Sequence, residues 1–219
     1  MADKKKGDKK NGNTLVHDTI CLTVITLVAG VLLGGVYTLT KKPIEKQDEI
    51  KKQQAYEAVF AGASFEEDAG IDSKREAFNE QIDAGKISAG GSTLSDVTLS
   101  EVLRAKKDGE DAGYVVTWSG KGYGGQVTIA LGIDSEGTIQ GIQITDCADE
   151  TPGLGQNSQN KDWNSQFIGM NKEQDIQVVK DGTGSVQNGS IDAISGATIT
   201  SKAVTAAING TLQFIGTLE

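Results

Sequence analysis

The chain has 219 residues, 37% of them apolar, and a formal net charge of −9. This allows one membrane segment and one globular domain with its own core. Residues 1–18 carry a net charge of +2 and residues 19–40 carry none, so residues 41–219 carry a net charge of −11. So acidic a domain, without a stripe of Lys and Arg, repels nucleic acid, which argues against DNA or RNA binding.

The His and Cys content argues against further classes. The single His17 precedes the acidic part, which therefore has no histidine for a Ser-His-Asp triad or an imidazole-bound metal. Two cysteines, Cys21 and Cys147, are too few for a four-thiolate iron–sulfur cluster. Cys21 lies in the uncharged run and Cys147 in the acidic part of the chain, so a disulfide between them is not expected. Cys147 could share a cluster or react with thiols, but a small buried apolar residue is the favoured interpretation. No metal site is expected, and a hydrolase is disfavoured.

The N-terminal part predicts a membrane anchor. Residues 1–13 are polar and predict a disordered tail within the segment 1–18. Residues 19–40 are 22 uncharged residues, and at about 1.5 Å per helical residue they span roughly 33 Å, enough for a bilayer core of about 30 Å. No Ala-x-Ala site follows, so a permanent single-pass anchor is favoured over a cleaved signal peptide. Five Lys lie on each side, so their count leaves the orientation open.

Residues 41–89 predict a juxtamembrane helical segment. Pro43 suits the first turn of a helix over residues 43–61, and a second short helix is expected at Lys74–Ala84, ended by Gly85. The sparse apolar stripe of the first helix would consist of Ile44, Ile50, Ala58 and Val59.

Residues 90–219 predict an α+β domain. Short β-branched runs separated by glycine turns indicate an antiparallel meander, with a hairpin at Ser135–Gly137. Helical spacing predicts a C-terminal helix over Ile199–Gly216, packed on one face of the sheet. The expected strands are Thr98–Ala105, Gly113–Trp118, Gln126–Asp134 and Thr138–Thr145.

The most informative segment lies just before that helix and reads DAISGATITS, from Asp192 to Ser201. Small and hydroxyl-bearing residues at a helix start let a phosphate approach free backbone N–H groups and the positive end of the helix dipole. The alternative is that Ser195 or Thr198 merely caps the helix. The residues alone leave both interpretations open.

The same string resembles the flavinylation motif Asp-x-x-Ser/Thr-Gly/Ser-Ala-Thr, in which FMN is attached to the final Thr by a phosphoester bond. The resemblance implies that Thr198 carries covalent FMN and that Asp192 belongs to the signal read by a flavin transferase. It also places five neighbours at the cofactor, in the turn and the first helical turn: Ser195, Gly196, Ala197, Thr200 and Ser201.

Two further strings extend the resemblance. Residues 121–125 (KGYGG) and 150–155 (ETPGLG) are, by themselves, glycine-rich turns, and neither is a Rossmann fingerprint. Their order, followed by SGAT, is similar to the FMN-binding domain of the G subunit of Rnf complexes; the C subunit of the sodium-pumping NADH:quinone oxidoreductase shares this layout. One departure is Ala148, where relatives often carry a His. The resemblance implies that five residues line the flavin site opposite Thr198: Glu150, Thr151, Gly153, Leu154 and Gly155.

The resemblance also implies a function. The chain would be a subunit of an ion-translocating oxidoreductase in a bacterial cell membrane, with a cytoplasmic N-terminus and an extracytoplasmic domain. It would pass electrons from a membrane-embedded iron–sulfur centre to a flavin on a neighbouring subunit, during transfer from ferredoxin to NAD⁺ coupled to Na⁺ or H⁺ translocation. It would have no substrate chemistry of its own. The alternatives are the quinone-reductase subunit and an anchored scaffold without redox function.

Three aromatic side chains are candidates for stacking on a flavin ring. They are Trp118, Tyr123 and Trp163, and packing in the core or on the surface is the alternative interpretation for each.

Overall fold

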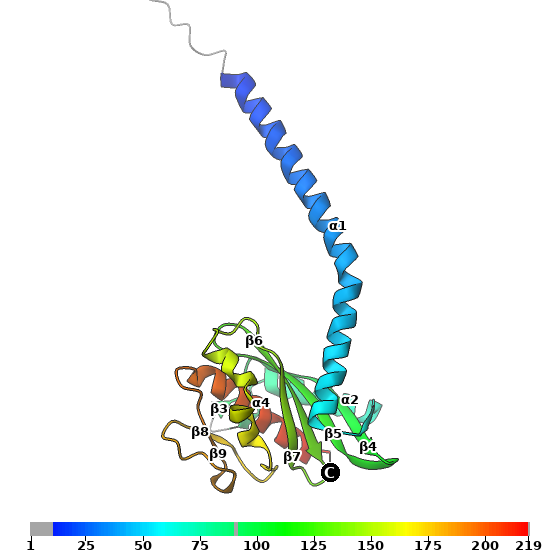
Figure 1. The fold of residues 1–219 in the computed structure, drawn as a ribbon, viewed down its shortest axis with the longest axis vertical. Coiled ribbons are helices and arrows are strands. Elements are labelled where there is room, and N and C mark those ends of the chain that lie inside the picture. The colour runs from blue at the N-terminus through cyan, green and yellow to red at the C-terminus, as the bar shows by residue number, and fades with distance from the viewer. Residues whose placement is uncertain (1–10, 90–91, 219) are drawn as a thin grey trace, which may run out of the picture. The chain divides into compact units, whose positions relative to one another are not determined.

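The computed structural model describes residues 11–89 and 92–218, so most of the predicted tail at residues 1–13 lies outside the described residues. The chain divides into two compact units, Met1–Ile50 and Lys51–Glu219. Each is described by itself (Figure 1).

Helix α1 (Asn11–Val59) contains the predicted anchor. Its segment Leu15–Val59 includes an 18-residue window of mean hydropathy 2.3 with no buried residue, so its length and composition suit a membrane span. Pro43 was expected to begin a separate helix, but it lies inside α1. A proline inside a helix removes one backbone hydrogen bond and its ring crowds the carbonyl one turn earlier, so Pro43 is the locally weak point of α1.

The second unit is built on a five-stranded antiparallel sheet with the order β1-β4-β5-β6-β7. All four strands predicted from the sequence are present, each within a few residues of its expected limits. The bounds are β1 Ser64–Glu66, β4 Val97–Lys107, β5 Glu110–Lys121, β6 Gln126–Asp134 and β7 Ile139–Asp146. The three-residue β1 was not predicted, because so short a strand has no readable alternation.

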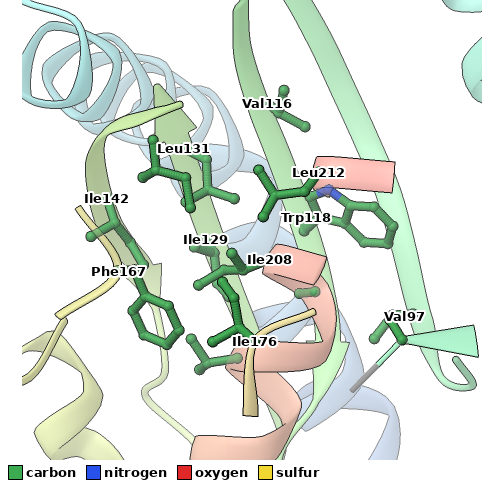
Figure 2. Packing of buried hydrophobic residues seen from close by; sticks show 14 of the residues in the cluster. Val97, Val116, Trp118, Ile129, Leu131, Ile142, Phe167, Ile176, Ile208 and Leu212 are labelled. Atoms are coloured by element: carbon green, nitrogen blue, oxygen red, sulfur yellow. The ribbon is translucent and has the colours of Figure 1, made fainter. Parts of the chain in front are cut away.

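Helix α4 (Thr198–Gly216) packs on one face of this sheet, as expected. Figure 2 shows Ile208 and Leu212 of α4 directed toward Ile129 and Trp118 of the sheet, with Phe167 beside them. These side chains belong to one buried apolar cluster that also includes residues of α2 (Ala69–Asp83). The site-bearing helix is therefore fixed by the main hydrophobic core.

The last turns of α1, which belong to the second unit, form a smaller cluster with Leu103 and Val115 of the sheet. Ala55, Tyr56 and Val59 are buried there. Of the four residues of the predicted stripe Val59 is buried, whereas Ile44, Ile50 and Ala58 are exposed. The backbone of Val59 approaches the paired glycines Gly132 and Gly141 so closely that a Cβ on either would lie 2.2 or 2.6 Å from its carbonyl oxygen.

Helix α2 begins five residues earlier than predicted because Asp68 caps it. The Asp68 carboxylate accepts hydrogen bonds from Gly70 N (2.8 Å) and Ile71 N (3.3 Å). A hydrogen bond from Arg104, at 2.9 Å, together with these two donors lowers the pKa of Asp68 from its ordinary value. Because α2 and β1 join the core and the sheet, the expected domain boundary at residue 90 falls inside the unit that begins at Lys51.

The segment between β7 and α4 contains short elements. Strand β8 (Gln177–Val179) pairs in parallel with β9 (Ser190–Asp192), and β9 leads into the turn before α4. The other elements of this segment are η1 (Gly155–Gln159), α3 (Lys161–Asn164), η2 (Ser165–Phe167) and η3 (Val186–Asn188). Two further short strands, β2 (Ser88–Ala89) and β3 (Ser92–Thr93), precede β4 in the chain.

Candidate functional site

The turn between β9 and α4 is stabilised by hydrogen bonds to a side chain in the first turn of the helix. Ser201 Oγ accepts a hydrogen bond from Ile194 N and donates one to Ala197 O, both at 2.9 Å. Gly196 has φ +76°, a left-handed conformation that glycine adopts without strain. These contacts close the SGAT string into a compact turn that ends at the first residue of the helix.

Helix α4 begins without a side-chain cap. Ala197 occupies the capping position and makes no side-chain hydrogen bond there, so the interpretation of Ser195 or Thr198 as a cap is not supported. The first N–H groups of a helix have no intrahelical acceptor, and they add to the positive end of the dipole. This end of α4 therefore retains the donors that an anion needs.

The hydroxyl groups of the string differ sharply in exposure. Thr200 and Ser201 are fully buried, Ser195 is exposed, and Thr198 is half-buried. The Thr200 hydroxyl donates to Glu150 Oε2 at 2.7 Å, which ties the helix start to the ETPGLG loop. Ser201 was expected at the cofactor, but the pocket does not include it, because its hydroxyl is used inside the turn.

Glu150 also contacts the third string. Its side chain is 2% exposed, and Oε1 accepts a hydrogen bond from Gly124 N at 2.9 Å. The three strings, far apart in the sequence, thus meet at one carboxylate. The resemblance implied that the ETPGLG loop lies opposite Thr198; it did not place the KGYGG string at the site.

These segments enclose a pocket of about 400 Å³. Eight of the predicted site residues line it: Glu150, Thr151, Leu154, Gly155, Gly196, Ala197, Thr198 and Thr200. Gly153 and Ser195 are next to lining residues in the chain but are not part of the lining. Tyr123 and Ile199 complete the wall. Ile199 was missed because the helical pattern predicts the buried face of α4 and gives no reason for an exposed Ile.

The pocket has an exposed apolar rim. Tyr123, Leu154 and Ile199 are 70, 39 and 55% exposed. In the described part of residues 51–218, Ile168 is the one further large apolar side chain of this kind. Apolar side chains gathered at a pocket in this way indicate a binding surface for an apolar group.

Of the three candidate aromatic residues, Tyr123 alone lies at the pocket. Trp118 is buried in the core (Figure 2). Trp163 donates its indole N–H to Asp192 O at 2.7 Å and so supports β9. Cys147 is buried and accepts a hydrogen bond from Gln159 Nε2. Among the described residues, no group of three or more His, Cys, Asp or Glu could hold a metal ion.

A family model described as "FMN-binding domain" matches residues 122–213, which contain the three strings of the pocket except Lys121. Residues 122–213 of the second unit thus match the class of FMN-binding domains. The chain is 30% identical to the G subunit of the ion-translocating oxidoreductase complex of Methanosarcina acetivorans, over 91% of this chain and 94% of that protein. It therefore belongs to the family of G subunits of ion-translocating oxidoreductase complexes.

Other relatives carry more specific names. The G subunit of the Na⁺-translocating ferredoxin:NAD⁺ oxidoreductase complex of Acetobacterium woodii is 44% identical over 52% of this chain, and the match spans 55% of that protein. The G subunit of the proton-translocating ferredoxin:NAD⁺ oxidoreductase complex of Clostridium ljungdahlii is 27% identical over 95% of each chain. Among solved structures, Shewanella oneidensis NqrC matches with a TM-score of 0.45 and 24% identity, over 53% of this chain and 59% of that one.

Proposed function

We propose that this chain is a membrane-anchored electron carrier whose FMN is joined to Thr198 by a phosphoester bond. The observation that carries the proposal is the position of Thr198. It is the first residue of α4, it lines the pocket, and the helix behind it starts without a side-chain cap. A phosphate on its hydroxyl would lie next to free N–H groups and the positive end of the helix dipole.

The remaining lining residues fit the rest of FMN. A volume of about 400 Å³ lies within the usual range of ligand pockets. Tyr123, Leu154 and Ile199 offer apolar contacts to a flat ring, and Gly155 and Gly196 add backbone surface to the lining. The bound flavin supplies one- and two-electron chemistry, which no side chain of this pocket can perform. The protein holds, orients and tunes the group.

The names of the relatives support a place in an Rnf-type complex that transfers electrons from ferredoxin to NAD⁺, coupled to movement of Na⁺ or H⁺. Its partners would be the other subunits of that complex and, for maturation, a flavin transferase. Residues 19–40 contain no Asp, Glu, Lys, Arg or His, so this anchor offers no carboxylate, cationic or imidazole side chain for an ion path. We therefore place the ion path in other subunits.

Intact mass measured on the full chain from a host that contains the transferase tests the attachment. We expect an added mass of one FMN less one water, mapped to the peptide that contains Thr198, and yellow-green fluorescence of the band after denaturing electrophoresis. A non-fluorescent chain of unmodified mass would instead favour the anchored scaffold without redox function.

We also propose that residues 1–18 lie in the cytoplasm and the FMN-binding domain lies outside it. Protease added to intact protoplasts should then digest the domain, whereas a cytoplasmic marker protein stays whole. Digestion that requires lysis of the protoplasts would contradict this orientation.

A further inference from the structure

Glu150 is the point at which the three segments of the pocket are joined. Oε2 accepts from the Thr200 hydroxyl of α4 at 2.7 Å, and Oε1 accepts from Gly124 N at 2.9 Å. The side chain is 2% exposed, and none of the ion pairs between described residues includes it. A buried carboxylate with two donors and no cation is costly unless something else offsets its charge.

The offset is supplied by α4. Thr200 is the third residue of this helix, so the carboxylate lies at the positive end of the helix dipole. A hydrogen bond from Thr200 therefore both satisfies Glu150 and fixes the rotation of the first turn, because the bond can form only when Thr200 points inward. The same rotation leaves Thr198, two residues earlier, on the side of the pocket.

Two glycines make room for this carboxylate. A Cβ on Gly155 would lie 1.9 Å from Glu150 Oε2, and a Cβ on Gly122 would lie 2.1 Å from Oε1. One glycine comes from each of the two glycine-rich strings. Neither has a positive φ, so the need for glycine at both positions comes from Glu150 rather than from the turn itself.

We propose that Glu150 is a positioning residue for Thr198. Through Thr200 it holds the first turn of α4 in the rotation that presents the Thr198 hydroxyl for flavin attachment, and it keeps a fixed negative charge in the pocket wall. That charge disfavours negative charge on a reduced flavin and lowers its midpoint potential. The inference rests on the proposed attachment of FMN to Thr198.

Two nearly isosteric variants separate the two effects of Glu150. Glu150→Gln removes the charge and leaves one oxygen for two donors. Thr200→Val removes the donor from α4 and keeps the charge. Glu136→Gln is the matched control, since it makes the same change of charge at an exposed position in the β6–β7 hairpin, at the opposite end of β7 from Glu150. Each full-length chain is matured in the host with the transferase.

We expect slower attachment in both pocket variants, by about tenfold, because each breaks a hydrogen bond to a charged group. The fraction modified, followed by intact mass after induction, measures this. The midpoint potential of the attached flavin should rise in Glu150→Gln and stay near the wild-type value in Thr200→Val and Glu136→Gln. A residue that only supports the fold would not produce this difference in potential.

Wild-type attachment rates in both pocket variants would overturn the inference, and so would equal potentials in Glu150→Gln and Glu136→Gln. If Glu150→Gln does not fold, Thr200→Val decides: slowed attachment supports the inference and unchanged attachment overturns it. An unmodified wild-type chain, by contrast, refutes the proposed function itself, so the two failures are distinguishable.

Discussion

Thr198→Ala is expected to yield a folded chain of unmodified mass, without fluorescence after denaturing electrophoresis. The substitution removes the hydroxyl that would form the phosphoester and leaves the pocket wall in place. Thr198 is half-buried at the helix start, so we expect the free energy of unfolding to change by about 0.5 kcal/mol or less. Intact mass and thermal unfolding measured on the same preparation check both parts.

Thr98→Ala is the matched control for this experiment, since it makes the same change at an exposed position on β4. Thr98 lies outside the SGAT string and does not line the pocket. The variant should carry as much covalent FMN as the wild type. Covalent FMN retained in Thr198→Ala, or lost in Thr98→Ala, would contradict the assignment of the attachment site to Thr198.

Gly155→Ala is expected to weaken both the fold and the attachment of flavin. The added Cβ would lie 1.9 Å from Glu150 Oε2 and 2.9 Å from Thr200 Oγ1, so it collides with the hydrogen bond between them. Overpacking of this kind costs about 1–3 kcal/mol. Urea denaturation of the detergent-solubilised chain should show a lower midpoint, and intact mass should show a smaller modified fraction.

Gly216→Ala gives the comparison for this variant. Gly216 ends α4, and a Cβ there would meet nothing within 4 Å. We expect wild-type stability and wild-type flavin content, since the same change meets no neighbour. Equal denaturation midpoints and equal modified fractions in Gly155→Ala and Gly216→Ala would contradict the view that Glu150 leaves no room for a Cβ at residue 155.

Covalent attachment of the flavin would change the task of the other contacts in the pocket. An electron carrier that binds its flavin covalently cannot lose it by dissociation, so the protein can use its remaining contacts to tune the potential. Under the proposed attachment, Glu150 would be one of these remaining contacts, because its hydrogen bonds go to the helix and the glycine loop. Tyr123, Leu154 and Ile199 remain as the exposed side chains available to the ring.

The local pattern of residues determined most of the elements by itself. Runs rich in β-branched residues predict β4 to β7, and the turn residues Ser135–Gly137 predict the hairpin between β6 and β7. The uncharged run at residues 19–40 predicts a membrane span without any tertiary contact. The residues of the SGAT string by themselves left two interpretations open, a phosphate-binding helix start and a helix cap, and the resemblance to the flavinylation motif favoured the first.

Only the tertiary structure decided how the site is assembled. The Glu150–Thr200 hydrogen bond joins residues 50 positions apart, and no period in the sequence encodes such a pair. The same holds for Tyr123 and Ile199 at the rim, and for the close approach of Val59 to Gly132 and Gly141. Secondary structure depends on neighbours a few residues away, whereas a pocket depends on which distant segments the packed core brings together.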